Sequence, residues 1–168
     1  ICPNAKPNTA HKVLAKMEKI GKLSAIVTQN IDGLHTMAGS KKVLELHGCV
    51  NRNYCQKCGK MFDAGFILKS KGIPHCECGG IIKPDVVLYE ESLDNDVVSE
   101  AVREIRSCDT LIVAGTSLTV YPAAGMINYF RGENLVLINR DSTPYDSQAD
   151  LVIHKKVGEV LGKINLGE

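Results

Sequence analysis

The chain has 168 residues, which suits one ordinary domain with a small insertion. Aromatic residues make up 5% and Trp is absent, which argues against a stacking platform for nucleic-acid bases. The formal net charge is +1, so no overall electrostatic attraction to nucleic acid or to an anionic membrane is expected. No apolar run approaches the ~20 residues that span a bilayer, and the chain does not open like a secretory signal. The composition predicts a soluble cytoplasmic protein that binds neither nucleic acid nor membrane.

The first part of the chain predicts one helix and two short strands. Apolar residues recur at helical spacing over 10–20, and Gly21 follows as a natural stop. Residues 23–28 and 43–46 are short apolar runs typical of buried strands. Polar side chains follow each run directly, so both strand ends are candidate positions for a binding site.

Residues 49–82 have a different character. Cys, Gly, Lys and Asn dominate this segment, and its apolar periodicity is weak. Such a segment has too little apolar surface for a core of its own. We expect a small inserted module that is held together by something other than hydrophobic packing.

Regular apolar patterns return in the second half of the chain. Strands are predicted at 111–114, 135–138 and 151–153, and helices at 94–106, 122–130 and 157–164. Strands that are apolar throughout and alternate with helices indicate a parallel sheet with both faces covered. The predicted fold class is therefore α/β, a parallel sheet with helices on both faces, interrupted by the module.

Four of the seven cysteines form two tight pairs, Cys55-x2-Cys58 and Cys76-x-Cys78, separated by 17 residues. Zinc takes four tetrahedral ligands, and closely spaced thiolates present two sulfurs to one ion. The pairs predict one structural zinc ion per chain, with His75 as a conceivable substitute ligand. The alternative is four unrelated thiols.

Two polar segments lie where a parallel sheet binds ligands. Gly115-Thr116-Ser117 follows one apolar strand and Asn139 follows the next, so they could contact a ligand beyond the carboxyl ends of the strands. An ordinary loop between a strand and a helix would look the same, and no G-x-G-x-x-G is present.

The segment 29–32 (Gln-Asn-Ile-Asp) and the dipeptide His47-Gly48 also follow strands. A His is suited to proton transfer near neutral pH, and an amide with a carboxylate can orient a polar substrate. The alternative is a simple turn and a histidine whose hydrogen bonds are satisfied.

Taken in order, these segments resemble the sirtuins, which are NAD-dependent protein lysine deacylases. The segments that carry the resemblance are 28–35 (TQNIDGLH), 46–48 (LHG), the four cysteines, 83–87 (KPDVV), 115–118 (GTSL) and 138–139 (IN). The resemblance implies a Rossmann-like NAD-binding domain formed by residues 1–48 and 83–168, with the zinc-binding module at 49–82. It also implies acyl-lysine proteins or peptides as substrates, with nicotinamide and O-acyl-ADP-ribose as products.

The resemblance assigns roles to particular residues. His47 would be the general base that activates a ribose hydroxyl. Asn30 and Asp32 would line the nicotinamide pocket, and Gln29 would contact the adjacent ribose. The remaining expected contacts are Gly115, Ser117, Asn139 and Val157 with NAD, Val86 and Val87 with the substrate peptide, and Cys55, Cys58, Cys76 and Cys78 with zinc.

Two departures from the family pattern are visible. Glu90 stands where the family usually has Gly, at the rim of the acyl tunnel. The Gly-Ala-Gly loop that cradles the NAD pyrophosphate, and the Asp-Phe-Arg segment after it, do not occur in these residues, and the chain opens on Ile1 without Met. We therefore expect a fold that is incomplete at its N-terminus.

Two alternatives remain open: a catalytically inactive zinc-bearing interaction fragment, and an NAD-dependent protein ADP-ribosyltransferase. Acyl preference and oligomeric state are not predicted.

Overall fold

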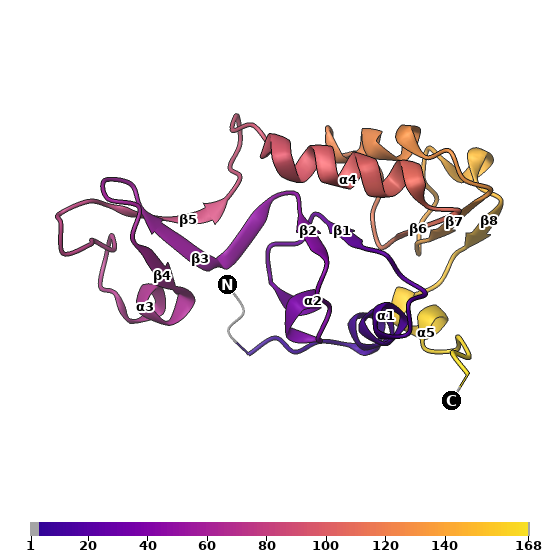
Figure 1. Cartoon of the computed structure of the whole chain (residues 1–168), viewed down its shortest axis with the longest axis horizontal. Coiled ribbons are helices and arrows are strands. Elements are labelled where there is room, and N and C mark those ends of the chain that lie inside the picture. The colour runs from indigo at the N-terminus through magenta and orange to yellow at the C-terminus, as the bar shows by residue number, and fades with distance from the viewer. Residues whose placement is uncertain (1–3, 168) are drawn as a thin grey trace.

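The computed structural model describes residues 4–167, and Figure 1 shows its elements in chain order. Its helices are α1 (Thr9–Lys19), α2 (Leu34–Met37), α3 (Ala64–Lys69), α4 (Asn95–Ser107) and α5 (Val157–Leu161), with the 3-10 helices η1 (Ala123–Tyr129) and η2 (Asp146–Gln148). Its strands are β1 (Ile26–Thr28), β2 (Val43–Glu45), β3 (Gly48–Cys55), β4 (Met61–Asp63), β5 (Ile82–Val86), β6 (Thr110–Ala114), β7 (Asn134–Ile138) and β8 (Leu151–Ile153). Within residues 4–167, no helix has the length and apolarity needed to cross a bilayer.

The parallel strands predicted from the sequence are confirmed. β1 pairs in parallel with β2, and β6, β7 and β8 form a parallel three-stranded sheet in that order. Within the described part of the chain these are two sheets rather than one. β1 and β6 are terminal strands in their sheets, and neither pairs with the other.

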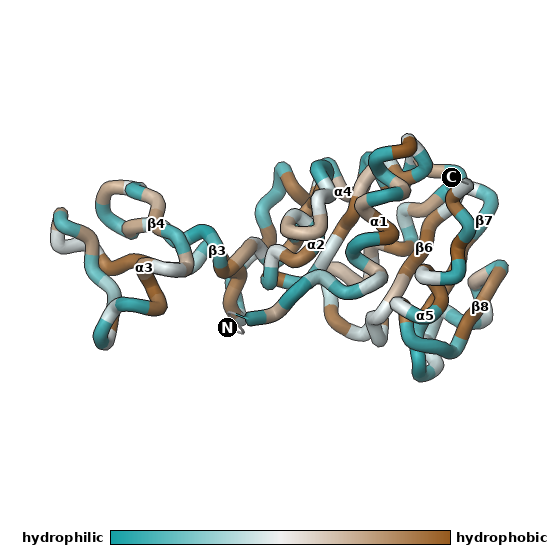
Figure 2. The backbone as a smooth tube through the Cα atoms, turned by 90° about the horizontal axis from the view of Figure 1, so that it is seen from below, coloured by the Kyte–Doolittle hydropathy of each residue, from teal (hydrophilic) through white to brown (hydrophobic). Residues whose placement is uncertain are grey.

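The two faces of the β6–β7–β8 sheet bury alternate residues. Leu135 and Leu137 of β7 pack into one core cluster, and Val136 and Ile138 pack against another on the opposite face. Side chains of a strand point alternately to opposite faces, so a continuous apolar run is required when both faces are covered. Figure 2 shows the resulting hydrophobic stretches along β6 and β7.

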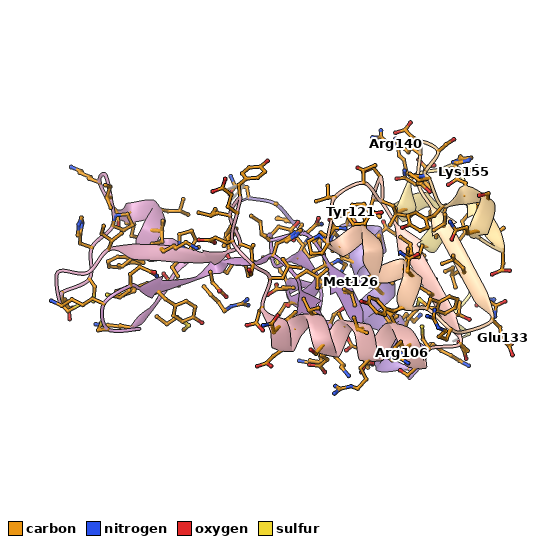
Figure 3. All side chains as sticks on the ribbon, turned by 90° about the horizontal axis from the view of Figure 1, so that it is seen from above. Arg106, Tyr121, Met126, Glu133, Arg140 and Lys155 are labelled. Carbon is orange, nitrogen blue, oxygen red and sulfur yellow. The ribbon has the colours of Figure 1, made fainter. Side chains whose placement is uncertain are left out.

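Helices cover both faces of this sheet, as predicted. Helices α1 and α5 pack together on one side, where Ala10 and Leu161 are buried against β7. On the other side α4 and η1 lie together, as Figure 1 shows. Met126 of η1 packs against Ala101 and Ile105 of α4, and Figure 3 labels Met126 beside that helix.

Local signals explain where α1 and α4 begin. Asn8 caps α1: its side-chain oxygen accepts a hydrogen bond from the His11 backbone N–H at 3.3 Å, and the His11 ring accepts one from the Asn8 backbone N–H at 3.2 Å. Asp94 caps α4 by accepting hydrogen bonds from the backbone N–H groups of Asp96 and Val97.

The cysteine-rich segment contains more secondary structure than its sequence pattern indicates. β3, β4 and β5 form an antiparallel sheet in the order β4–β3–β5, with α3 packed against β3 and β4. In Figure 1 this sheet projects away from the other elements. Its buried cluster is small, consisting of Cys55, Cys76 and Ile82 with three partly buried neighbours. The weak apolar periodicity follows from this small core.

One predicted helix has a different form. The segment predicted as a helix over 122–130 is the 3-10 helix η1, with Pro122 as its N-terminal flanking residue. Gly125 lies in its middle, and glycine disfavours a continuous α-helix. The strand predicted at 23–28 is also shorter, because β1 begins only at Ile26.

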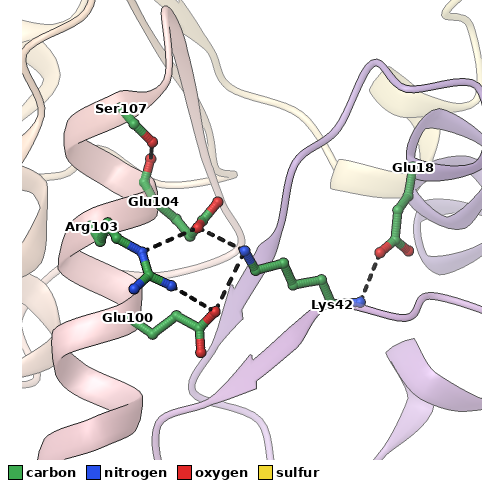
Figure 4. A network of polar contacts seen from close by, with 6 residues as sticks. All are labelled: Glu18, Lys42, Glu100, Arg103, Glu104 and Ser107. Carbon is green, nitrogen blue, oxygen red and sulfur yellow. Dashed lines mark hydrogen bonds and ion pairs between the residues drawn. The ribbon is translucent and has the colours of Figure 1, made fainter.

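A polar network ties α1 and α4 to the start of β2, as Figure 4 shows. The Glu18 carboxylate of α1 accepts hydrogen bonds from the backbone N–H groups of Lys41 and Lys42, at 2.8 and 2.7 Å. The Lys42 ammonium lies 2.7 Å from Glu104 and 3.5 Å from Glu100, both on α4. The hydrogen bond that the Lys42 ammonium donates to the Glu104 carboxylate is the main cause of the raised pKa of Lys42, and Glu100 adds to it. The network therefore fixes where β2 starts.

Candidate active site

The loop after β1 is held by hydrogen bonds to its own backbone. The Thr28 hydroxyl accepts a hydrogen bond from the Asn30 N–H at 3.1 Å, and the Asp32 carboxylate accepts one from the Leu34 N–H at 2.9 Å. Gly33 has a positive φ of 70°, and a Cβ there would lie 2.5 Å from the Asn51 side chain. The loop thus needs glycine at this turn, and Asn30 remains exposed at its start.

Two histidine rings in tilted contact lie close to Asp32. The ring centroids of His11 and His35 are 4.6 Å apart. Burial lowers the pKa of both imidazoles, the proximity of His11 lowers that of His35 further, and the Asp32 carboxylate opposes both effects. The pair is therefore neutral near pH 7 and adds no positive charge beside the loop.

His47 lies at the end of β2 and is oriented by the same loop. Its Nδ1 is 3.0 Å from the carbonyl oxygen of Gln29, which can only accept a hydrogen bond. The proton of a neutral His47 ring therefore resides on Nδ1, which leaves Nε2 with a free lone pair. An imidazole held in this tautomer has its Nε2 available as a base.

Gly48 brings β5 unusually close to His47. Gly48 has a φ of 73°, and a Cβ there would lie 2.0 Å from the backbone oxygen of Asp85. Gly48 pairs with Val86, and the Val87 N–H donates a hydrogen bond to the His47 carbonyl at 3.1 Å. In its sheet β5 is a terminal strand, and no strand of the described structure pairs with its second edge, although the Lys83 ammonium donates a hydrogen bond to the Val86 carbonyl at 3.2 Å. An extended peptide could add to such an edge.

Three charged residues that the sequence analysis did not single out surround this junction. The Arg52 guanidinium lies 2.7 Å from Glu45 on β2 and 2.8 Å from Asp85 on β5. Burial opposes the charged form of Arg52, but the hydrogen bonds to Glu45 and Asp85 outweigh it and raise the pKa of the guanidinium. No spacing rule links residues on three strands, so sequence patterns alone could not have found this group.

A second group of predicted residues lies at the carboxyl ends of β6, β7 and β8. Gly115 donates its N–H to the Ile138 carbonyl at 2.9 Å, and Asn139 donates its N–H to Ile153 at 3.2 Å. A Cβ on Gly115, whose φ is 65°, would lie 3.5 Å from Val157. The structure therefore brings Gly115, Asn139 and Val157 to one end of the sheet, where parallel sheets bind ligands.

Two side chains of this second group are engaged locally. The Ser117 hydroxyl lies 2.7 Å from that of Thr119, and the Asn139 side-chain amide donates to the Asp141 carbonyl at 2.9 Å. The Asn139 amide oxygen remains available as an acceptor in this arrangement. Within residues 4–167, no hydrogen bond or ion pair joins this second group directly to His47.

The four cysteine sulfurs of the module lie within 4.8 Å of one another. The Cys55 and Cys78 sulfurs are 3.4 Å apart, and those of Cys58 and Cys76 are 3.7 Å apart. Zn–S bonds of about 2.3 Å in a tetrahedron require sulfurs about 3.8 Å apart, so the donor set fits zinc. His75 is not part of this cluster, and its Nδ1 lies 2.8 Å from the Ile73 carbonyl.

Comparison of the sequence with known proteins shows the family of this chain. Residues 1–122 match the Sir2 family. The chain belongs to this family. An NAD-dependent protein deacetylase of Clostridium perfringens (strain 13 / Type A) is 66% identical over 166 residues, covering 98% of this chain and 68% of the relative. One of Clostridium tetani (strain Massachusetts / E88) is 60% identical over 162 residues, covering 95% of this chain and 66% of the relative. The chain thus spans about two thirds of their length.

Solved structures of the Sir2 family share this fold. A structure described as Sir2 bound to acetylated peptide has a TM-score of 0.88 at 42% identity, covering 94% of this chain and 69% of that chain. A structure described as Sir2–p53 peptide–NAD+ has a TM-score of 0.86 at 43% identity, covering 94% and 68%. The Rossmann-like α/β architecture inferred from the sequence is therefore confirmed.

Within this Sir2 fold the predicted residues form three groups. The first group is Gln29, Asn30, Asp32, His47, Val86 and Val87, the second is Gly115, Ser117, Asn139 and Val157, and the third is the four cysteines. The first and third groups are connected through β3, which runs from Gly48 beside His47 to Cys55 in the cysteine cluster.

Proposed function

We propose that this protein removes acetyl or other acyl groups from lysine side chains of proteins, with NAD as co-substrate. The observation that carries the proposal is the position of His47: its ring is fixed through Nδ1 by Gln29, and its carbonyl is bonded to Val87 beside the open edge of β5. A base and a peptide-pairing edge thus meet at one point. Relatives in the Sir2 family that carry the name NAD-dependent protein deacetylase support this reading.

The reaction consumes acyl-lysine, NAD and water, and it yields lysine, nicotinamide and O-acyl-ADP-ribose. NAD supplies a ribose carbon whose bond to nicotinamide breaks as the acyl oxygen of the substrate bonds to it. Nε2 of His47 would then take the proton of a neighbouring ribose hydroxyl, whose oxygen would bond to the carbon of the resulting imidate. The lysine amine would leave from this carbon, and water would supply the acyl oxygen of the product while the original acyl oxygen stays on the ribose. A base on a fixed ring lowers the cost of the proton transfer because no reorientation is needed.

The other residues of the first group position the reactants. Asn30 is exposed at the start of the loop and, with Asp32, would line the pocket for the nicotinamide amide. Gln29 contributes its carbonyl to His47 and would contact the ribose with its side chain. Val86 and Val87 would pair with the backbone of the substrate peptide along the open edge of β5.

The second and third groups would bind the remainder of NAD and the metal. Gly115, Ser117, Asn139 and Val157 would contact NAD, the first three at its adenosine half. The four cysteine sulfurs would hold one structural zinc ion, since four thiolates complete the tetrahedron and leave no position for a substrate. We also place the protein in the cytoplasm, because thiolates that bind zinc must stay reduced.

Two activities of the intact enzyme test this function. Exchange of labelled nicotinamide into NAD, dependent on an acetyl-lysine peptide, reports the step before His47 acts. Release of deacylated peptide reports the whole reaction. His47→Ala should keep the exchange and lower the deacylation by about 10²–10⁴-fold, the usual contribution of a general base.

His75→Ala provides the matched control, because His75 is exposed and its ring bonds only to a nearby carbonyl. It should retain both activities. A wild-type enzyme that catalyses neither reaction would disprove the proposal, and wild-type deacylation by His47→Ala would remove His47 from the mechanism. In a separate reaction with NAD labelled in its ADP-ribose part, label that becomes attached to protein would instead indicate ADP-ribosyl transfer.

A further inference from the structure

The group around Arg52 joins three strands that meet at the proposed catalytic centre. Arg52 lies on β3, and its Nη1 and Nε contact Glu45 on β2 and Asp85 on β5 at 2.7 and 2.8 Å. β2 and β5 belong to different sheets, so no ladder of backbone hydrogen bonds runs between them. The guanidinium therefore bridges two parts of the fold that backbone pairing leaves largely independent.

An irregularity in β3 places Arg52 in this position. The pairing of β3 with β5 jumps from Cys49 opposite Asp85 to Asn53 opposite Pro84, so three residues of β3 bulge out. The bulge contacts the loop after β1: the Val50 N–H donates to the Ile31 carbonyl at 3.0 Å. Bulges re-aim side chains next to functional sites, and here the bulge turns Arg52 toward Glu45.

The two carboxylates are close in sequence to functional residues. Glu45 precedes His47 by two residues, and Asp85 directly precedes the substrate-pairing strand residues Val86 and Val87. We propose that Arg52 is a positioning residue that sets His47 against the substrate strand by holding Glu45 and Asp85 together. This inference rests on the deacylase function proposed above, and it assigns to Arg52 a role that does not involve contact with substrate.

Of the three charged side chains, Glu45 is the most buried, so the loss of Arg52 should displace Glu45 most. The Glu45 side chain is only 11% exposed, whereas those of Arg52 and Asp85 are about 40% exposed (41% and 40%). Removing the guanidinium leaves Glu45 as a poorly solvated, unpaired carboxylate, which must move toward water. Because Glu45 lies two residues before His47, this movement shifts the imidazole relative to β5.

The forked guanidinium suits this task better than an ammonium group would. Arg presents several N–H donors in one rigid plane, so Nη1 and Nε can bind two different carboxylates at fixed angles. Lysine offers a single point charge on a flexible chain. Arg52→Lys should therefore recover only part of the function that Arg52→Met loses.

The test compares the same two activities in variants of the intact enzyme. Arg52→Met should lower peptide deacylation by about 10–100-fold, as expected when a supporting residue is lost or a catalytic group shifts by ~1 Å. Nicotinamide exchange precedes the action of His47 and should stay near the wild-type rate. Glu45→Gln preserves shape and removes the charge, so it should show the same selective loss even if Arg52→Met folds poorly.

Two further variants sharpen the result. Arg131→Met is the matched control, because Arg131 is exposed and its guanidinium donates to the backbone carbonyls of Asn128 and Phe130, so both activities should stay unchanged. The double variant Glu45→Gln/Arg52→Met should lose no more deacylation than either single variant, since the two residues act as a unit.

The outcomes separate this inference from the function on which it rests. A wild-type enzyme without either activity disproves the deacylase function itself. A functional wild type with equal loss of exchange and deacylation in Arg52→Met and Glu45→Gln assigns these residues a purely structural role and overturns the inference. Unchanged deacylation in both variants overturns it as well.

Discussion

Gly48 shows how one residue without a side chain can determine the geometry of the candidate site. It combines a left-handed backbone with an approach to β5 so close that a Cβ would lie 2.0 Å from the Asp85 oxygen. The dipeptide His47-Gly48 is therefore a single structural unit. In the proposed reaction the histidine would supply the base, and the glycine allows β5 to pass directly beside it.

Gly48→Ala should destabilise the protein more than the same change at Gly72, which has the same φ of 73° but nothing within 4 Å of a Cβ. Both variants incur the cost of a left-handed alanine, about 1 kcal/mol. Gly48→Ala adds a steric clash with rigid backbone, worth about 1–3 kcal/mol more. Urea unfolding at equilibrium measures the free energy of unfolding of both variants. An equal decrease in Gly48→Ala and Gly72→Ala would show that the backbone near Gly48 accommodates the added methyl group without strain.

Glu90 is the opposite case, a residue with a side chain in a glycine position. Its φ is 70°, in the left-handed region that favours glycine. Glycine is usual at this position in the family, and the observed backbone gives the physical reason. The departure seen in the sequence therefore changes the side chain at this position, while the chain retains the turn.

At the scale of elements, α4 depends on a defined start. Asp94 satisfies two backbone N–H groups at the first turn, and the helix then buries Ala101 and Ile105 against the core containing Leu44 and Leu46. Leu46 directly precedes His47. The helix thus supports the strand end that carries the proposed base.

Asp94→Ala should lower the free energy of unfolding by about 1 kcal/mol, the usual cost of losing an N-cap oxygen. Asp94→Asn keeps a capping oxygen and removes the charge, so it should retain most of the stability. Chemical denaturation monitored by circular dichroism distinguishes the two variants. Equal loss in both would attribute the effect to charge rather than to capping.

At the scale of the whole molecule, a single strand, β3, links the cysteine module to the candidate active site. β3 runs from Gly48 beside His47 to Cys55 in the cysteine cluster, and the bulge between Cys49 and Asn53 contacts the loop after β1. The buried core of the module is small, so metal binding must supply much of its stability. Loss of zinc is therefore expected to disturb the site from a distance.

Elemental analysis should find about one zinc ion per chain, and Cys55→Ser or Cys78→Ser should lose it, because four thiolates complete the tetrahedron. Hydrogen exchange should then accelerate in β4 and α3 before it does in β6 and β7. Cys108→Ser serves as the control, since Cys108 follows α4 outside the cluster and should keep full zinc content. A metal-free chain in which hydrogen exchange in β4 and α3 stays slow would show that zinc does not stabilise the module.

The sequence by itself determined the features that depend on local pattern. Apolar runs such as 135–138 predicted buried parallel strands, the spacing of the cysteines predicted their convergence, and the residues around His47 indicated the family. These signals are readable because periodicity, capping and ligand spacing act between residues that are close along the chain.

Only the tertiary structure decided how distant segments meet. It placed the Gln29 carbonyl against the His47 ring, the Gly48 backbone against Asp85, and the Arg52 guanidinium between two strands. It also formed an antiparallel sheet from a segment with little apolar pattern. These features depend on contacts between residues far apart in sequence, where three-dimensional packing and hydrogen-bond geometry, rather than spacing, select the partners.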